Sequence, residues 1–100
     1  MKAKMNRWYG WTTETDPKVL DNKYRLMLLK AGFTIVNNCE YHFKPYGYTK
    51  LYLLAESHFA IHTFPEEGKT YLELSSCVDN QYNRFMALIG AESRRLDNGV

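Results

Sequence analysis

The stretch from 48 to 64 constrains the fold more than any other part of the chain. Its seventeen residues are rich in Tyr, Leu, Ile and Phe, and they include neither Gly nor Pro. Strands of globular proteins rarely exceed about ten residues, so this stretch is too long for a single strand. The polar triplet Glu56-Ser57-His58 interrupts it. The stretch therefore predicts two strands of ordinary length.

The segment before this stretch predicts a helix and a strand. Asp16 has the side chain of a helix N-cap, and Pro17 suits the first helical position. Gly32 stands where a C-terminal cap is expected. Apolar residues at helical spacing between these ends are Leu20, Tyr24, Met27, Leu28 and Ala31. Residues 33–43 then predict a strand, which ends at the turn-forming sequence Lys44-Pro45-Tyr46-Gly47.

The segment after this stretch predicts another strand and a shorter helix. Residues 65–68 have turn composition, and residues 69–75 alternate as a strand does. A second helix is predicted by the spacing of Tyr82, Phe85, Met86 and Ile89. Residues 91–100 are polar, and we expect them to fray.

With a strand before the first helix, the predicted order is strand, helix, four strands and helix. This order predicts an α+β fold, a two-layer sandwich in which an antiparallel sheet carries both helices on one face. With 100 residues we expect a single domain over 1–100. The other face of the sheet is left uncovered. The chain has eight Tyr, five Phe and two Trp, side chains that favour interfaces and pockets. We therefore expect a second copy of the chain to bury that face in a homo-oligomer.

Composition excludes several functional classes. The formal net charge is +2 with both signs interspersed, which does not indicate a nucleic-acid partner. The apolar runs are too short for a membrane span, and the basic N-terminus has no apolar segment of a secretory signal, so we expect a cytoplasmic protein. Cys39 and Cys77 do not have the spacing of metal ligands, so we expect two free thiols and no metal site. We expect Cys39 to have a structural role.

The residues around the polar triplet are the candidates for chemistry. His58, Ala60, His62 and Phe64 fall on one strand face by their alternation. We expect the two histidines and Ser57 to project near one another. A functional cluster and a polar edge strand facing water both fit this pattern.

The sequence around this cluster resembles the small bacterial and archaeal S-adenosylmethionine decarboxylase proenzymes. Residues 56–66, ESHFAIHTFPE, are similar to the family pattern ESHxxIHTWPE. The resemblance covers residues 7–90, and its other matching positions are Tyr9-Gly10, Asp16-Pro17, Ala31-Gly32, Phe43, Pro45, Gly47 and Cys77. It implies the family's α+β fold and a ligand of the S-adenosylmethionine type.

The resemblance also implies catalytic roles. The family cuts itself between residues that match Glu56 and Ser57, and the serine becomes a pyruvoyl group, an electron sink for loss of carbon dioxide. His62 matches the acid and base of this processing, and Cys77 matches the acid that protonates the substrate carbon. Thr49 stands where the family has a hydroxyl. Read without the family, Ser57 suits a hairpin, His62 a hydrogen-bonded strand and Cys77 a buried core.

Substrate-binding roles follow from the same resemblance. Phe43 and Phe64 match the two aromatic positions that sandwich adenine, with Phe64 in place of the usual Trp. Glu66 matches the carboxylate that binds the ribose hydroxyls, and His58 belongs to the motif as a substrate-binding or orienting group. Read without the family, these residues suit ordinary core or turn positions.

Several positions depart from the family pattern. Lys50 follows Thr49 where the family has glycine, and we expect its ammonium to lie near the Glu56–Ser57 bond and pair with Glu56. Val78 follows Cys77, again in place of glycine. The N-terminal segment from Arg7 to Trp11 is unusually aromatic, and residues 91–100 show no pattern of the further strand that the family has.

Three functions stay open from the sequence. The first is a self-processing, pyruvoyl-dependent S-adenosylmethionine decarboxylase of polyamine biosynthesis, a carbon–carbon lyase. The second is a lyase without a pyruvoyl cofactor, which cleaves S-adenosylmethionine or a nucleotide conjugate of it to methylthioadenosine and homoserine lactone. The third is a sensor of S-adenosylmethionine or a partner subunit without catalysis. In each case we expect the ligand site at a subunit interface.

Overall fold

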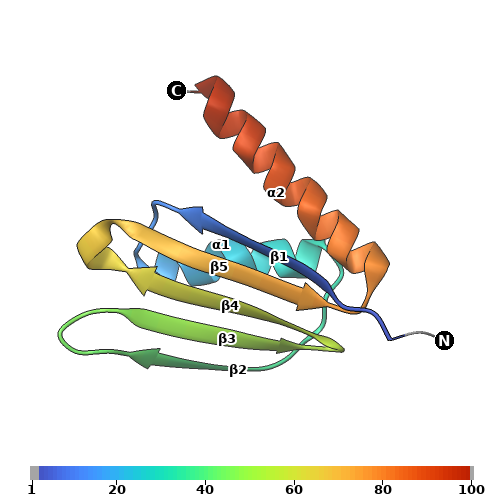
Figure 1. The fold of residues 1–100 in the computed structure, drawn as a ribbon, viewed down its shortest axis with the longest axis horizontal. Helices are drawn as coiled ribbons and strands as arrows, with labels where there is room; N and C mark the ends of the chain where they lie inside the picture. Colours follow the sequence, from blue (N-terminus) through green and yellow to red (C-terminus); the bar gives the residue numbers. More distant parts are fainter. Residues whose placement is uncertain (1–2, 100) are drawn as a thin grey trace.

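The structure, a computed structural model, describes the backbone of residues 3–99 and the side chains of residues 3–91. Its elements follow the predicted order of strand, helix, four strands and helix (Figure 1). They are β1 (Asn6–Thr12), α1 (Pro17–Lys30), β2 (Ile35–His42), β3 (Tyr48–Leu54), β4 (Ser57–Phe64), the short 3-10 helix η1 (Pro65–Glu67), β5 (Lys69–Ser76) and α2 (Asp79–Gly99).

The strands form one antiparallel sheet in the order β1-β5-β4-β3-β2. Three successive hairpins join β2 to β5, and β1 then pairs with β5 at the far edge (Figure 1). Strand β4 therefore lies in the centre, with β3 on one side and β5 on the other. The polar triplet of residues 56–58 therefore lies where the central strand of the sheet begins.

Both helices pack on the same face of the sheet, which confirms the predicted α+β sandwich. Phe59 of β4 is fully buried, and its ring centroid lies 5.5 Å from that of Tyr24 in α1 and 5.6 Å from that of Phe85 in α2. Leu20 and Leu28 of α1 complete the same apolar cluster. Burial of these side chains supplies the main stabilisation of the fold.

Local signals set the ends of α1 as predicted. A carboxylate oxygen of Asp16 accepts the backbone N–H groups of Lys18 and Val19, which are two of the donors that a helix start leaves free. Gly32 follows the cap residue Ala31 with a φ of +95°, a conformation that favours glycine.

Two sequence expectations about element ends are wrong. The break between β3 and β4 falls at Ala55-Glu56, so Ser57 is the first residue of β4 instead of part of the turn. Helix α2 continues to Gly99, although we expected residues 91–100 to fray. The segment 91–96, AESRRL, consists mainly of good helix formers, and the helix extends beyond the sheet (Figure 1).

The opposite face of the sheet carries no helix in the described part of the chain. Large apolar side chains are nevertheless exposed there, namely Tyr9, Trp11, Tyr41, Leu51 and Leu53. No helix among the described residues is long and apolar enough to cross a membrane. We call this sheet surface the open face.

Candidate functional site

The turn between β3 and β4 holds its second residue in an unfavourable conformation. Leu54 pairs with Ser57, which leaves Ala55 and Glu56 as the two residues of the turn. Glu56 has a φ of +61°, in the left-handed region that residues with a Cβ disfavour by about 1–2 kcal/mol. The peptide that follows this residue is the one between Glu56 and Ser57. Backbone strain is therefore stored beside the bond that the sequence singled out.

Donors surround the carbonyl oxygen of Glu56. The Ser57 hydroxyl donates to it at 2.7 Å, the Cys77 thiol at 2.9 Å and the Cys77 backbone N–H at 3.4 Å. The pairing of β4 with β5 brings these residues together, because Ser57 stands opposite Ser76. The two donors of Cys77 polarise the carbonyl and stabilise negative charge on its oxygen, and Ser57 Oγ is the atom close enough to attack it. The arrangement suits attack by the Ser57 hydroxyl on the carbonyl carbon of Glu56.

His62 and Thr49 form a second group. They pair in register on neighbouring strands, and Thr49 Oγ1 lies 3.0 Å from His62 Nδ1. The ring of Tyr71 lies beside the imidazole, with 6.1 Å between the centroids. The hydroxyl holds the imidazole in a defined orientation, which a histidine that moves protons requires.

These two groups lie apart within one chain. His62 is five residues beyond Ser57 in β4, a rise of about 16 Å along a strand. Alternation also places them on opposite faces of β4. The expectation that Ser57 and both histidines project near one another is therefore wrong for a single chain, and the reason is the odd spacing along an extended strand.

Phe43 and Phe64 lie at the same end of the sheet. The Phe43 N–H donates to the Gly47 carbonyl at 2.7 Å, and the Tyr48 N–H donates to Thr63 Oγ1 at 2.9 Å. By strand register Gly47 thus lies between the backbones of Phe43 and Phe64, and it has no side chain. Since neighbouring strands are about 4.8 Å apart, the two backbones are separated by about 10 Å. Both side chains are exposed, and their ring centroids lie close to other aromatic rings, Phe64 at 6.0 Å from Trp11 and Phe43 at 4.9 Å from Tyr41.

The two remaining predicted residues, Glu66 and His58, are both exposed on the surface. Glu66 is exposed in η1, two residues after Phe64, and its backbone therefore belongs to the same end of the sheet. His58 is exposed on the open face and borders a shallow hollow of about 410 Å³. The hollow is also lined by Asn37, Asn38, Cys39, Leu51, Tyr52 and Leu53.

Both cysteines are free and exposed. Cys39 therefore has no place in the core, contrary to the structural role expected for it. Exposure of Cys77 leaves its thiol open to a ligand.

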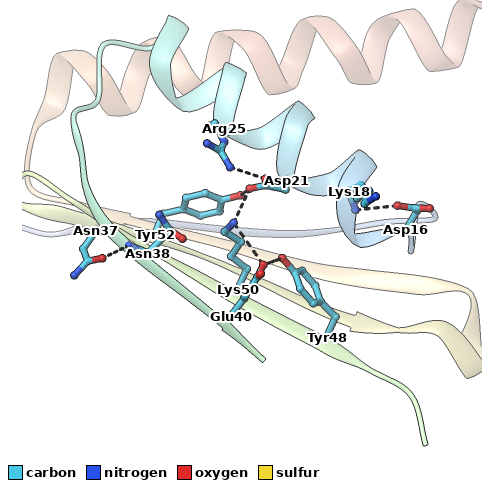
Figure 2. Close-up of polar contacts among 10 residues, drawn as sticks. All are labelled: Asp16, Lys18, Asp21, Arg25, Asn37, Asn38, Glu40, Tyr48, Lys50 and Tyr52. Carbon is cyan, nitrogen blue, oxygen red and sulfur yellow. Dashed lines mark hydrogen bonds and ion pairs between the residues drawn. The ribbon is translucent and has the colours of Figure 1, made fainter. Parts of the chain in front are cut away.

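Lys50 does not pair with Glu56, and this sequence expectation is wrong. Its side chain lies on the helix-covered face, where Nζ is 3.0 Å from Asp21 Oδ1 and 3.6 Å from Glu40 Oε1 (Figure 2). Only 5% of the residue is exposed. Because side chains alternate along β3, Thr49 points to the open face and Lys50 to α1.

Hydrogen bonds keep Asp21 ionised in this cluster (Figure 2). Burial opposes the charge, but hydrogen bonds from Tyr52, Lys50 and Arg25 hold the pKa of Asp21 below its usual value. The pKa of Tyr52 is raised by burial and by its hydrogen bond to Asp21. The cluster therefore connects α1 to β3 through a charged lysine and a charged aspartate.

Replacement of Lys50 by alanine should destabilise the protein by about 3 kcal/mol, because it leaves Asp21 short of its buried partner. Urea unfolding followed by circular dichroism measures the change. Lys69→Ala is the matched control, since Lys69 pairs with Glu67 at 3.5 Å on the surface, and such pairs contribute about 0–1 kcal/mol. Equal stability of the two variants would contradict the structural role of Lys50.

Two features of the site were missed by reading the sequence. Gly47 was predicted as a turn residue and as a position that matches the family, but not as the residue between the backbones of Phe43 and Phe64, and Ser76 carried no signal beyond its position next to Cys77. The hairpin register that brings Ser76 to Ser57 depends on the exact turn between β4 and β5. If Phe64 and Lys69 are taken as the first pair beside that turn, counting seven residues along each strand pairs Ser57 with Ser76.

Comparisons with known proteins agree with this geometry. The sequence model described as S-adenosylmethionine decarboxylase matches residues 9–92. The S-adenosylmethionine decarboxylase proenzyme of Parasynechococcus marenigrum (strain WH8102) is 38% identical over 73 residues, which cover 67% of this chain and 57% of that protein. The proenzyme of Thermosipho africanus (strain TCF52B) is 33% identical over 73 residues, 67% of this chain and 56% of its own length.

A solved structure is also similar. The crystal structure of the adenosylmethionine decarboxylase from Aquifex aeolicus VF5 matches with a TM-score of 0.59 and 29% sequence identity, over 83% of this chain and 71% of that chain. The chain spans about half the length of the curated relatives it matches. Because the sequence model covers most of its residues and a solved relative has its fold, this chain belongs to the S-adenosylmethionine decarboxylase family.

Proposed function

We propose that this chain is a self-processing S-adenosylmethionine decarboxylase that makes a pyruvoyl cofactor from Ser57. The observation that carries the proposal is the contact of the Ser57 hydroxyl with the Glu56 carbonyl oxygen at 2.7 Å. The Cys77 thiol and backbone N–H donate to the same oxygen, and Glu56 is strained. Family membership supports the proposal, since the curated relatives reported above are named proenzymes.

The first step converts the peptide into an ester. Ser57 Oγ attacks the carbonyl carbon of Glu56, a C–O bond forms, the C–N bond breaks, and the hydroxyl proton ends on the nitrogen of Ser57. The donors of Cys77 stabilise the charge on the carbonyl oxygen during the attack. Relief of the left-handed conformation at Glu56 favours the same direction.

The second step breaks the ester by elimination. A base removes the Cα proton of Ser57, and Glu56 leaves as a carboxylate at the new C-terminus. Water then replaces the nitrogen, ammonia is released, and residue 57 becomes the pyruvoyl group. That group withdraws electrons from the substrate as carbon dioxide leaves. An imidazole is suited to the elimination because its ring nitrogen can accept a proton and later release it.

The base comes from a second copy of the chain. Within one chain His62 is too far from Ser57, yet Thr49 orients its imidazole on the open face. Pairing of two copies over that face would bury its exposed aromatic side chains. We propose that it also brings His62 of one copy to the Glu56–Ser57 turn of the other, although the Ser57 side chain itself points to the helix-covered face. We therefore propose a homo-oligomer of single domains, with each site shared between two copies.

Phe43 and Phe64 are proposed to bind the adenine ring of S-adenosylmethionine. Both side chains are exposed at the same end of the sheet, and aromatic faces attract both a purine and a nearby sulfonium. Glu66 is proposed to accept hydrogen bonds from the two ribose hydroxyls. His58 is proposed to bind or orient the amino-acid part of the substrate.

Phe64→Ala should weaken S-adenosylmethionine binding about fivefold to thirtyfold, because one stacking surface is lost. Isothermal titration calorimetry measures the dissociation constant. Leu26→Ala serves as the control, since Leu26 is an exposed apolar residue on the outer side of α1. Unchanged affinity of Phe64→Ala would remove the ring from the ligand site.

Intact mass spectrometry of the purified wild-type chain, combined with an assay of its products, tests the proposed function. We expect fragments 1–56 and 57–100 and release of labelled carbon dioxide from carboxyl-labelled S-adenosylmethionine. An uncut chain that forms methylthioadenosine and homoserine lactone would establish the lyase reaction instead. An uncut chain that binds without turnover would establish a sensor, and either result overturns the decarboxylase.

A further inference from the structure

Besides the Glu56 carbonyl oxygen, the Ser57 hydroxyl contacts a second group, the hydroxyl of Ser76, which the mechanism above does not use. Ser57 Oγ lies 2.7 Å from Ser76 Oγ, the same distance as from the Glu56 carbonyl oxygen. Ser76 is fully buried, and its Oγ accepts the Val78 backbone N–H at 3.0 Å. The Val78 carbonyl oxygen lies 3.5 Å from the same Oγ.

We infer that Ser76 is a positioning residue for self-cleavage, which directs the proton of Ser57 away from the Glu56 carbonyl. This inference rests on the proposed function, because it concerns the first step of the same reaction. It adds a residue that acts on the nucleophile from the covered side of the sheet.

The hydroxyl protons of Ser57 and Ser76 allow two hydrogen-bond arrangements. Each serine hydroxyl has one proton to donate. In one arrangement Ser76 donates to Ser57, and Ser57 donates to the Glu56 carbonyl. In the other arrangement Ser57 donates to Ser76, and Ser76 donates to the Val78 carbonyl. Only the second arrangement leaves a lone pair of Ser57 directed at the Glu56 carbonyl, as the attack requires.

The position of Ser76 is fixed by several independent contacts. It stands opposite Ser57 in the register of β4 and β5, and the two side chains share the helix-covered face. The Val78 N–H anchors the Ser76 oxygen from the chain that leaves β5. A serine hydroxyl is otherwise free to rotate among three staggered positions. Contacts on both sides therefore hold Ser57 in the rotamer that faces the strained peptide.

The time course of self-cleavage tests the inference. Freshly made chain is followed by denaturing gel and intact mass, for wild type, Ser76→Ala, Ser76→Thr and Ser75→Ala. We expect Ser76→Ala to slow the appearance of the two fragments by about tenfold or more, as loss of positioning does. Ser76→Thr keeps the hydroxyl and should restore cleavage. Ser75→Ala, on the opposite face of β5, is the matched control and should cleave like wild type.

Circular dichroism melting separates positioning from folding. Ser76→Ala removes one atom and should keep a cooperative unfolding transition, so slow cleavage in a folded chain supports the inference. Wild-type rates in Ser76→Ala would overturn it, as would equal slowing in Ser76→Ala and Ser76→Thr, which would indicate packing alone. An uncut wild-type chain would overturn the proposed function and this role together, whereas the preceding results overturn only the role of Ser76.

Discussion

Ser57→Ala is expected to leave the chain whole and to abolish release of carbon dioxide from S-adenosylmethionine. Alanine has no oxygen to attack the Glu56 carbonyl, so no ester forms and no cofactor arises. The loss should be complete, because no other hydroxyl donates to that carbonyl among the described residues. Intact mass spectrometry and a carbon dioxide assay measure the two effects.

The variant should keep its fold, since Ser57 contributes no apolar surface to the core cluster. Ser75→Ala again provides a matched control from the same part of the sheet. Cleavage at residue 56 in the Ser57→Ala chain, or carbon dioxide release without cleavage, would refute the assigned nucleophile. Either result would require a different source for the reactive carbonyl.

Co-expression of two inactive variants should restore self-cleavage. Ser57→Ala lacks the nucleophile and His62→Ala lacks the proposed base, so each chain alone should stay uncut. A mixed dimer contains one site that joins Ser57 of one chain with His62 of the other. With random pairing, about half of the His62→Ala chains should then be cut, because half of their partners carry an intact His62.

Different tags on the two chains let mass spectrometry assign each fragment. Only the His62→Ala chain should be cut, because it alone retains Ser57. Light scattering on the wild-type protein is the accompanying control, and a monomer at micromolar concentration would contradict the shared site. Cleavage of His62→Ala expressed alone would show that His62 is not the required base.

The distance of the Thr49–His62 pair from Ser57 is the reason why co-expression of the two variants is informative. The two residues make one hydrogen-bonded pair within a chain, and the chain keeps that pair away from Ser57. A site complete in one subunit would gain nothing from a partner. Restoration in the mixture therefore distinguishes a shared site from two separate ones.

Local sequence determined several features of this protein by itself. The ends of α1 follow from Asp16, Pro17 and Gly32, because capping depends on side chains within a few residues of the helix end. The apolar spacing of α1 likewise predicted which of its side chains face the core. The motif of residues 56–66 identified the family, since its residues match in type and order.

Features that depend on distant partners were decided only by the tertiary structure. The sequence placed Lys50 beside Glu56, but the alternation of β3 directs it to Asp21 on a helix far away in the chain. Strand geometry separates His62 from Ser57, although they are five residues apart. Hairpin register brings Ser76 to Ser57, although nineteen residues separate them. Side-chain type is a local property, whereas proximity depends on how strands pair, and pairing is settled by burial over the whole sheet.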